Sequence, residues 1–258
     1  MRRSLSMLAA VLVVVSAFAA VADAAPADYG RVVINNSSAK GGVAPVVFDH
    51  WLHRAKYTCR LCHVDIGFGL KGNATGITAA DNAKGVYCGA CHNGKLDVGG
   101  KKLFAACGPD KADKRCDRCH SQGKNVKPEH DFTAFTAKFP KDKFGNGVNW
   151  EKAAEDGLIT LSDKLPGVSI DQPAKSVQSD FTIRPKTAGM GEIIFSHKKH
   201  VLWNGCEVCH PEVFKGGRRG TQVYSMDEIR QKKFCGVCHT TVAFPLEDCA
   251  RCHTKPVK

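Results

Sequence analysis

Phe48-Asp49-His50-Trp51-Leu52-His53 stands shortly before Cys59-Arg60-Leu61-Cys62-His63, and this arrangement returns 147 residues later in the chain. The second copy reads Phe195-Ser196-His197-Lys198-Lys199-His200 and then Cys206-Glu207-Val208-Cys209-His210. Self-similarity at one fixed offset is the mark of a duplicated structural unit. We therefore expect two related modules, each opened by an F-x-H-x-x-H segment.

The C-x-x-C-H pattern occurs six times and uses twelve of the thirteen cysteines. Two cysteines three positions apart on a helical turn can each add to one haem vinyl group, and the next histidine lies on the same face, where it can bind the iron. Zinc and dithiol redox sites also use C-x-x-C pairs, but neither explains a histidine after every pair. The sequence therefore predicts six covalently bound haem c groups. The attachment cysteines are Cys59, Cys62, Cys88, Cys91, Cys116, Cys119, Cys206, Cys209, Cys235, Cys238, Cys249 and Cys252. The proximal iron ligands are His63, His92, His120, His210, His239 and His253.

Besides the six motif histidines, six irons need six further axial ligands. An iron whose sixth position is open can bind a substrate, whereas an iron with both axial positions filled favours electron transfer. Outside the motifs the chain has five histidines, and the segment after residue 24 has two methionines. Five histidines and one methionine would close all six irons. The histidines in question are His50, His53, His130, His197 and His200.

The spacing of the paired histidines limits how they can bind. On a helix, residues three positions apart point the same way, with Cβ atoms about 5–6 Å apart, so one such pair cannot lie on opposite sides of one iron. His50 and His53 must then serve different irons, and so must His197 and His200. Each pair would hold two haems side by side, as electron transfer between them requires.

With H-x-x-H ahead of three C-x-x-C-H motifs in each copy, the chain resembles the triheme c(7)-type cytochrome domains, over about residues 43–120 and 190–253. The resemblance implies that the first histidine of each pair, His50 or His197, binds the haem attached next in sequence. It also implies that the second, His53 or His200, binds the middle haem of its module.

The resemblance further implies that the third haem of a module takes a histidine or methionine from the segment before the middle motif. The second copy offers Met226 there, whereas the first copy has Ala79. For the haem of Cys116 and Cys119, His130 is the leading candidate. The alternatives are Met190, a ligand from a partner chain, or an iron with an open position.

Four segments are expected. They are a signal peptide over 1–24, an N-terminal triheme module over 25–120, a haem-free connector over 121–189 and a C-terminal triheme module over 190–258. The signal follows from Arg2 and Arg3, the apolar run after them and the Ala22-Asp23-Ala24 cleavage site.

The fold class expected is mostly irregular with short α-helices, because about 39 residues per haem leave the haems to supply much of the core. A strand pair is expected near 31–34 and 46–48. A short helix capped by Asn149 should run through Glu155. Cys107, in an insertion of the first copy, is expected to be a free or buried thiol.

The formal charge of +12 could suggest nucleic acid or an anionic membrane as partner. The propionates of six haems would offset most of this charge, so we expect no nucleic acid binding. No stretch after the signal is long and apolar enough to cross a membrane, so we expect no integration into the membrane. The function predicted is an electron carrier between redox proteins, exported to the periplasm or cell surface of a Gram-negative bacterium. One alternative is a subunit of a larger assembly, either a haem filament or other oligomer, or a quinol-oxidising complex. The other alternative is a small reductase that uses the haem of Cys116 and Cys119.

Overall fold

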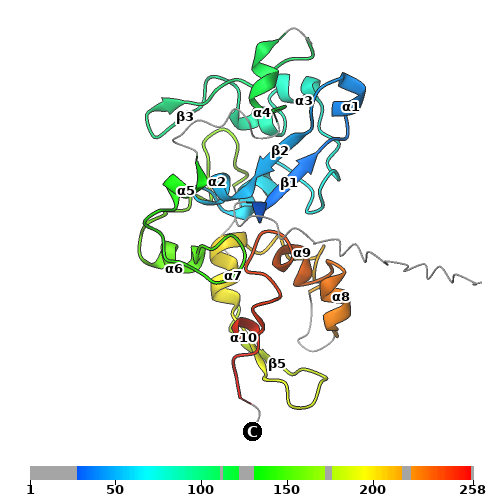
Figure 1. Cartoon of the computed structure of the whole chain (residues 1–258), viewed down its shortest axis with the longest axis vertical. Coiled ribbons are helices and arrows are strands. Elements are labelled where there is room, and N and C mark those ends of the chain that lie inside the picture. The colour runs from blue at the N-terminus through cyan, green and yellow to red at the C-terminus, as the bar shows by residue number, and fades with distance from the viewer. Residues whose placement is uncertain (1–27, 111–112, 122–130, 172–175, 217–221, 257–258) are drawn as a thin grey trace, which may run out of the picture.

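The computed structural model describes residues 28–110, 113–121, 131–171, 176–216 and 222–256 (Figure 1). The expected signal peptide and His130 lie outside these residues. The fold is mostly irregular with short helices, as predicted. The longest helix among the described residues has eight residues. In Figure 1 the N-terminal half of the chain lies at the top and the C-terminal half at the bottom.

The N-terminal module opens on a strand pair that leads directly into the first histidine pair. Strand β1 (Arg31–Ile34) is antiparallel to β2 (Val46–Asp49), with Val32 opposite Phe48, so the predicted strand pair is confirmed. The remaining elements are α1 (Ser38–Gly41), α2 (His50–Arg54), the π-turn η2 (Leu61–Asp65), α3 (Ala79–Ala83), α4 (Cys88–Cys91), β3 (Asp97–Val98), β4 (Lys101–Lys102) and the 3-10 turn η3 (Lys114–Arg118).

The C-terminal module repeats this plan. Strand β5 (Phe181–Ile183) is antiparallel to β6 (Ile193–Phe195), which leads into α7 (His197–Asn204). The Ser196 side chain starts that helix by accepting a hydrogen bond from the Lys199 N–H at 3.3 Å. The helices that follow are α8 (Met226–Arg230), α9 (Gly236–His239) and α10 (Cys249–Cys252). Since β5 lies within residues predicted as connector, the strand pair of this module begins ahead of residue 190.

The helices before the two middle motifs are equivalent. Thr78 and Asp81 form a capping box on α3, and Ser225 and Glu228 form the same box on α8. These positions are 147 residues apart, so the sequence repeat is also a structural repeat.

The connector carries α5 (Phe132–Phe135) and α6 (Trp150–Glu155). The Asn149 side chain accepts a hydrogen bond from the Lys152 N–H at 3.0 Å, which confirms the predicted cap. Among the described residues, the buried apolar cluster combines two residues at α2 with five from the connector. Its members are Trp51, Ala55, Phe139, Val148, Trp150, Ala153 and Ile159. The apolar core therefore lies where the connector packs on α2, while the surroundings of the attachment motifs contribute little to it.

Candidate haem sites

The attachment motifs, numbered first to sixth in chain order, form single helical turns. In five of them the histidine N–H donates to the carbonyl of the first cysteine, at 2.8–3.0 Å. The second motif coincides with α4, and the sixth with α10. An i to i+4 bond brings both cysteines and the histidine to one side of the turn. This geometry suits two thioethers and one iron ligand on the same haem.

The two middle motifs require glycine after their first cysteine. A Cβ on Gly89 would lie 1.9 Å from the Asn82 carbonyl oxygen, and one on Gly236 would lie 1.8 Å from the Ile229 carbonyl oxygen. In each case the C-terminal end of the preceding helix, α3 or α8, contacts the backbone of the motif. This close approach fixes the middle motif against the helix before it.

We expect Gly236→Ala to destabilise the C-terminal module by about 1–3 kcal/mol or more, because the added methyl group must displace backbone. Thermal unfolding would measure the loss as a lower midpoint. Gly41→Ala is the matched control, since its Cβ would lie at an ordinary 3.6 Å from the Val43 side chain. Equal midpoints for the two variants would contradict the contact.

The histidine side chains share one hydrogen-bond pattern. Nine of the ten described histidines hold Nδ1 at 2.6–3.3 Å from a backbone carbonyl oxygen; the tenth is His92. The partners of His120 and His253 are Ala44 and Gly191, which are again 147 residues apart. When Nδ1–H donates to a carbonyl, Nε2 keeps its lone pair free for a metal. This arrangement fits iron ligation through Nε2.

Two histidine pairs stand out across the modules. The ring centroids of His53 and His92 are 6.3 Å apart, and those of His200 and His239 are also 6.3 Å apart. An iron bound by two imidazole nitrogens at roughly 2 Å each would separate the ring centres by about 6 Å. The structure thus brings together the second histidine of each F-x-H-x-x-H segment and the proximal histidine of the middle motif.

For the other candidate ligands, the structure shows no such short separation from a motif histidine among the described residues. His50 lies near enough to His63 for the His63 charge to contribute, after burial, to lowering the pKa of His50. Met226 is the first residue of α8, as Ala79 is of α3, and its side chain is 38 % exposed. Met190 precedes Gly191, so it lies beside the proximal histidine of the sixth motif rather than the third. The ligand role of Met226 stays a prediction.

Burial sets the ionisation of both kinds of side chain. Loss of hydration lowers the pKa of His92 and of His239 to about 4, so both imidazoles are neutral at pH 7, as metal binding requires. It also raises the pKa of Cys62 and of Cys238 to about 12. Such surroundings disfavour a thiolate, whereas an uncharged thioether carries no such cost. Both thiols are therefore neutral at pH 7.

Phenylalanines hold the imidazoles in both modules. Phe48 lies 4.5 Å from the His53 ring, and Phe195 lies 4.3 Å from the His200 ring. Sequence reasoning gave these residues no role, although their place in the repeated F-x-H-x-x-H segment marks them. Phe104 and Phe244 contact the proximal histidines of the middle motifs at 4.2 and 4.3 Å. The repeat could not reveal this second pair, because its members do not share the 147-residue offset.

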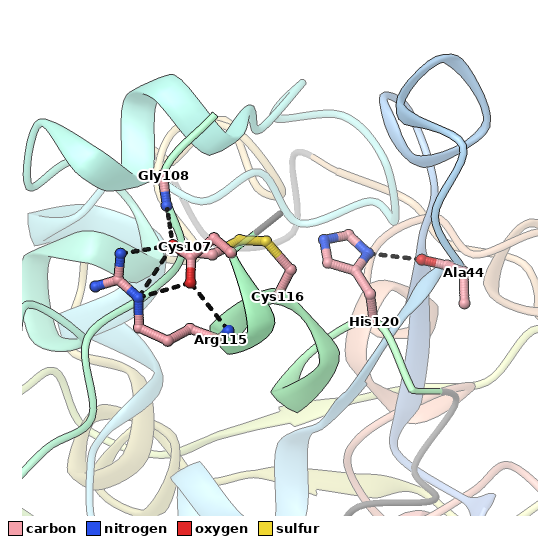
Figure 2. The surroundings of a disulfide bond; sticks show 7 residues. Ala44, Cys107, Gly108, Arg115, Cys116 and His120 are labelled. Carbon is pink, nitrogen blue, oxygen red and sulfur yellow. Dashed lines mark hydrogen bonds and ion pairs between the residues drawn. A yellow bond between two sulfur atoms is a disulfide. The ribbon is translucent and has the colours of Figure 1, made fainter. Parts of the chain in front are cut away.

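The third motif differs from the expectation. Cys107, predicted as a free or buried thiol, forms a disulfide with Cys116, the first attachment cysteine of this motif (Figure 2). The carboxylate of Asp113 accepts hydrogen bonds from the backbone N–H groups of Gly108 at 3.2 Å and Arg115 at 3.0 Å. This turn folds the insertion back on the motif. A sulfur in a disulfide cannot also form a thioether, so haem attachment at Cys116 requires reduction of this bond.

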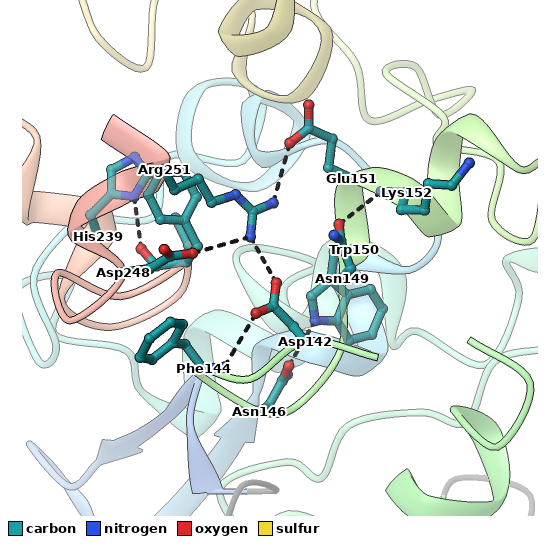
Figure 3. Close-up of polar contacts among 12 residues, drawn as sticks. Asp142, Phe144, Asn146, Asn149, Trp150, Glu151, Lys152, His239, Asp248 and Arg251 are labelled. Carbon is teal, nitrogen blue, oxygen red and sulfur yellow. Dashed lines mark hydrogen bonds and ion pairs between the residues drawn. The ribbon is translucent and has the colours of Figure 1, made fainter. Parts of the chain in front are cut away.

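The connector is fixed to the sixth motif by Arg251, the residue before its second cysteine (Figure 3). The guanidinium lies 2.8 Å from Asp142 and 3.2 Å from Glu151 in the connector, and Glu151 also pairs with Lys199 of α7. Burial alone would raise the pKa of Glu151, but hydrogen bonds from Lys199 and Arg251 lower it overall. The carboxylate thus stays charged and joins the connector to the second module.

The two modules meet at the first and fourth motifs. Arg60 of the first motif lies 3.6 Å from Glu207 of the fourth. A Cβ on Gly205, the residue before the fourth motif, would lie 2.7 Å from the Arg60 side chain. Attachment motifs of both modules are therefore in contact.

Within the described part of the chain, no helix combines the length and the apolar character needed to cross a membrane.

Comparison with known proteins gives one family and three related structures. The family model for cytochrome c7 and related cytochrome c matches residues 46–121 and 193–254. The C-terminal hexaheme fragment of GSU1996 is 28% identical, with 87% of this chain and 96% of that fragment covered and a TM-score of 0.26. Its N-terminal hexaheme fragment is 27% identical, with 87% and 98% covered and a TM-score of 0.26. The dodecaheme cytochrome c GSU1996 is 26% identical, with 87% and 49% covered and a TM-score of 0.25. TM-scores this low do not show a shared arrangement of the modules. No curated protein matches the chain.

Proposed function

The chain belongs to the family of cytochrome c7 and related cytochrome c, and on this premise we propose that it is a hexahaem electron carrier. When bound, each haem iron exchanges single electrons between its ferrous and ferric states. The protein would pass electrons between redox partners outside the cytoplasm, in the periplasm or at the cell surface. The twelve attachment cysteines and six motif histidines would hold the haems.

The observation that carries the proposal is the matched separation of two histidine pairs. His53 with His92, and His200 with His239, have ring centroids 6.3 Å apart in both modules. Two histidines around one iron close both axial positions, and a closed iron favours electron transfer over substrate chemistry. The same separation in both copies supports a ligand role more strongly than either pair would alone.

For the other irons, we propose His50 opposite His63 and His197 opposite His210. Met226 would complete the sixth site. His130 would complete the third site. These four ligand assignments follow from the motif count and the family resemblance.

The contact between the modules supports transport along the whole chain. Arg60 of the first motif lies 3.6 Å from Glu207 of the fourth, so the two modules meet at attachment motifs as well as through the connector. Electrons could then enter at one module and leave at the other.

The haem count tests the proposal directly. Expressed with cytochrome c maturation and export, the mature protein should carry six covalent haems, each adding about 616 Da to the denatured mass. Peptide mapping should find Cys116 in a thioether and Cys107 as a thiol, once the disulfide has been reduced. Cys107→Ser removes the competing bond and should also give six haems.

A denatured mass short by one or more haems in the wild type would contradict the count. If only Cys107→Ser reached six, the disulfide would be a block to attachment at the third motif. Carbon monoxide binding by the ferrous wild type would point to an open or weakly ligated iron and favour the reductase alternative over the carrier.

A further inference from the structure

Arg54 reaches from the N-terminal module into the C-terminal one. It is the last residue of α2 and follows His53, yet its Nη1 donates a hydrogen bond to the carbonyl oxygen of Val242. Beside it, the Tyr29 hydroxyl donates to the Ala243 carbonyl oxygen at 2.6 Å. Two side chains of the first module thus hold the segment that follows the fifth motif.

The guanidinium lies in a mostly aromatic setting. Its central carbon is 5.1 Å from the ring centroid of Trp150 in the connector and 5.3 Å from that of Trp203 in α7. Rings at this distance attract a cation through their quadrupole. Three parts of the chain, the first module, the connector and the second module, therefore meet at this one side chain.

This cation keeps its charge. Among the residues that the structure describes, the contacts of the guanidinium are the Val242 carbonyl oxygen and the rings of Trp150 and Trp203. Loss of hydration lowers the pKa of Arg54, but a guanidinium stays protonated at neutral pH. A permanent positive charge is thus present at the junction.

Hydrogen bonds relate this charge to one attachment site. Val242, whose carbonyl oxygen accepts from Arg54, donates its own N–H to the carbonyl oxygen of Cys238 in the fifth motif at 2.9 Å. Reduction makes a haem iron less positive by one charge, so a cation held nearby in a poorly hydrated region favours the reduced form.

Resting on the proposed function, we propose that Arg54 is a positioning residue that joins the modules and raises the reduction potential of the haem at the fifth motif. Electrons would then be stabilised where the two modules meet, and the crossing between them would be favoured.

The test is a redox titration followed by absorption spectroscopy, on samples whose haem count has been checked by denatured mass. Arg54→Gln should keep six haems and shift the reduction potential of the haem at the fifth motif to a lower value. The expected change is about tenfold in its one-electron equilibrium constant, or about 59 mV. Arg54→Lys retains the charge and should restore most of the wild-type curve. Arg184→Gln is the control, because the Arg184 side chain is 87% exposed and pairs with Glu192 away from the junction.

If Arg54→Gln loses haems, a second variant carries the test. Val242→Glu adds a carboxylate to the residue whose carbonyl oxygen accepts from the guanidinium, and it should lower the same potential, since it offsets the charge without removing Arg54. A six-haem Arg54→Gln with the wild-type curve, or an equal shift in Arg184→Gln, would overturn the inference and leave the proposed function standing. A wild-type protein with fewer than six haems would instead overturn the proposed function.

Discussion

In His200→Ala, one of the six low-spin ferric haems is expected to lose its sixth ligand. The ring centroids of His200 and His239 are 6.3 Å apart, and the Phe195 ring stacks on that of His200 with centroids 4.3 Å apart. Alanine cannot bind iron, and the His200 Nδ1 bond to the Ser196 carbonyl shows that this imidazole is oriented by its own helix. Electron paramagnetic resonance of the oxidised protein should therefore lose one low-spin signal and gain a high-spin one.

His53→Ala is the corresponding variant in the first module and should affect one haem in the same way. Lys198→Ala is the control, since Lys198 is an exposed residue of the same helix. In the double variant His53→Ala with His200→Ala, two low-spin centres should be lost. Six unchanged low-spin signals in either single variant would remove the ligand assignment for that module.

Met226→His is expected to remove a His/Met iron site and lower the potential of one haem. A neutral thioether stabilises ferrous iron relative to an imidazole, so a His/Met haem lies at higher potential than a bis-histidine one. The wild type should show the near-infrared charge-transfer band of a ferric His/Met site, near about 695 nm, and the variant should lack it. If Met226 binds the haem of Cys249 and Cys252, electrons would collect at the C-terminal end of the chain.

Met190→Leu provides the control for this experiment. Met190 is the other methionine after residue 24 and is similarly exposed, at 42% against 38% for Met226. The band should persist in Met190→Leu. Its absence from the wild type would mean that Met226 is not a ligand, and the proposed direction of electron flow would lose its support.

The amino-acid sequence by itself determined the features that depend on short spacing. The i to i+4 geometry of each C-x-x-C-H motif, the duplication at 147 residues and the Asn149 cap all involve residues whose relation is fixed by helical periodicity. The strand pair before His50 follows from the same local pattern. Such features need no knowledge of the rest of the chain.

Tertiary structure alone decided the contacts that cross loops of unequal length. The insertion returns Cys107 to Cys116, Phe104 and Phe244 reach equivalent histidines from unequal offsets, and Arg54 meets Val242 across 188 positions. The number of residues between two positions does not predict such contacts, because the entropic cost of closing a loop changes little with its length. The Arg54 contact also involves Trp150, which lies 5.1 Å from the guanidinium and packs with Trp51 of α2 in the cluster that buries apolar surface.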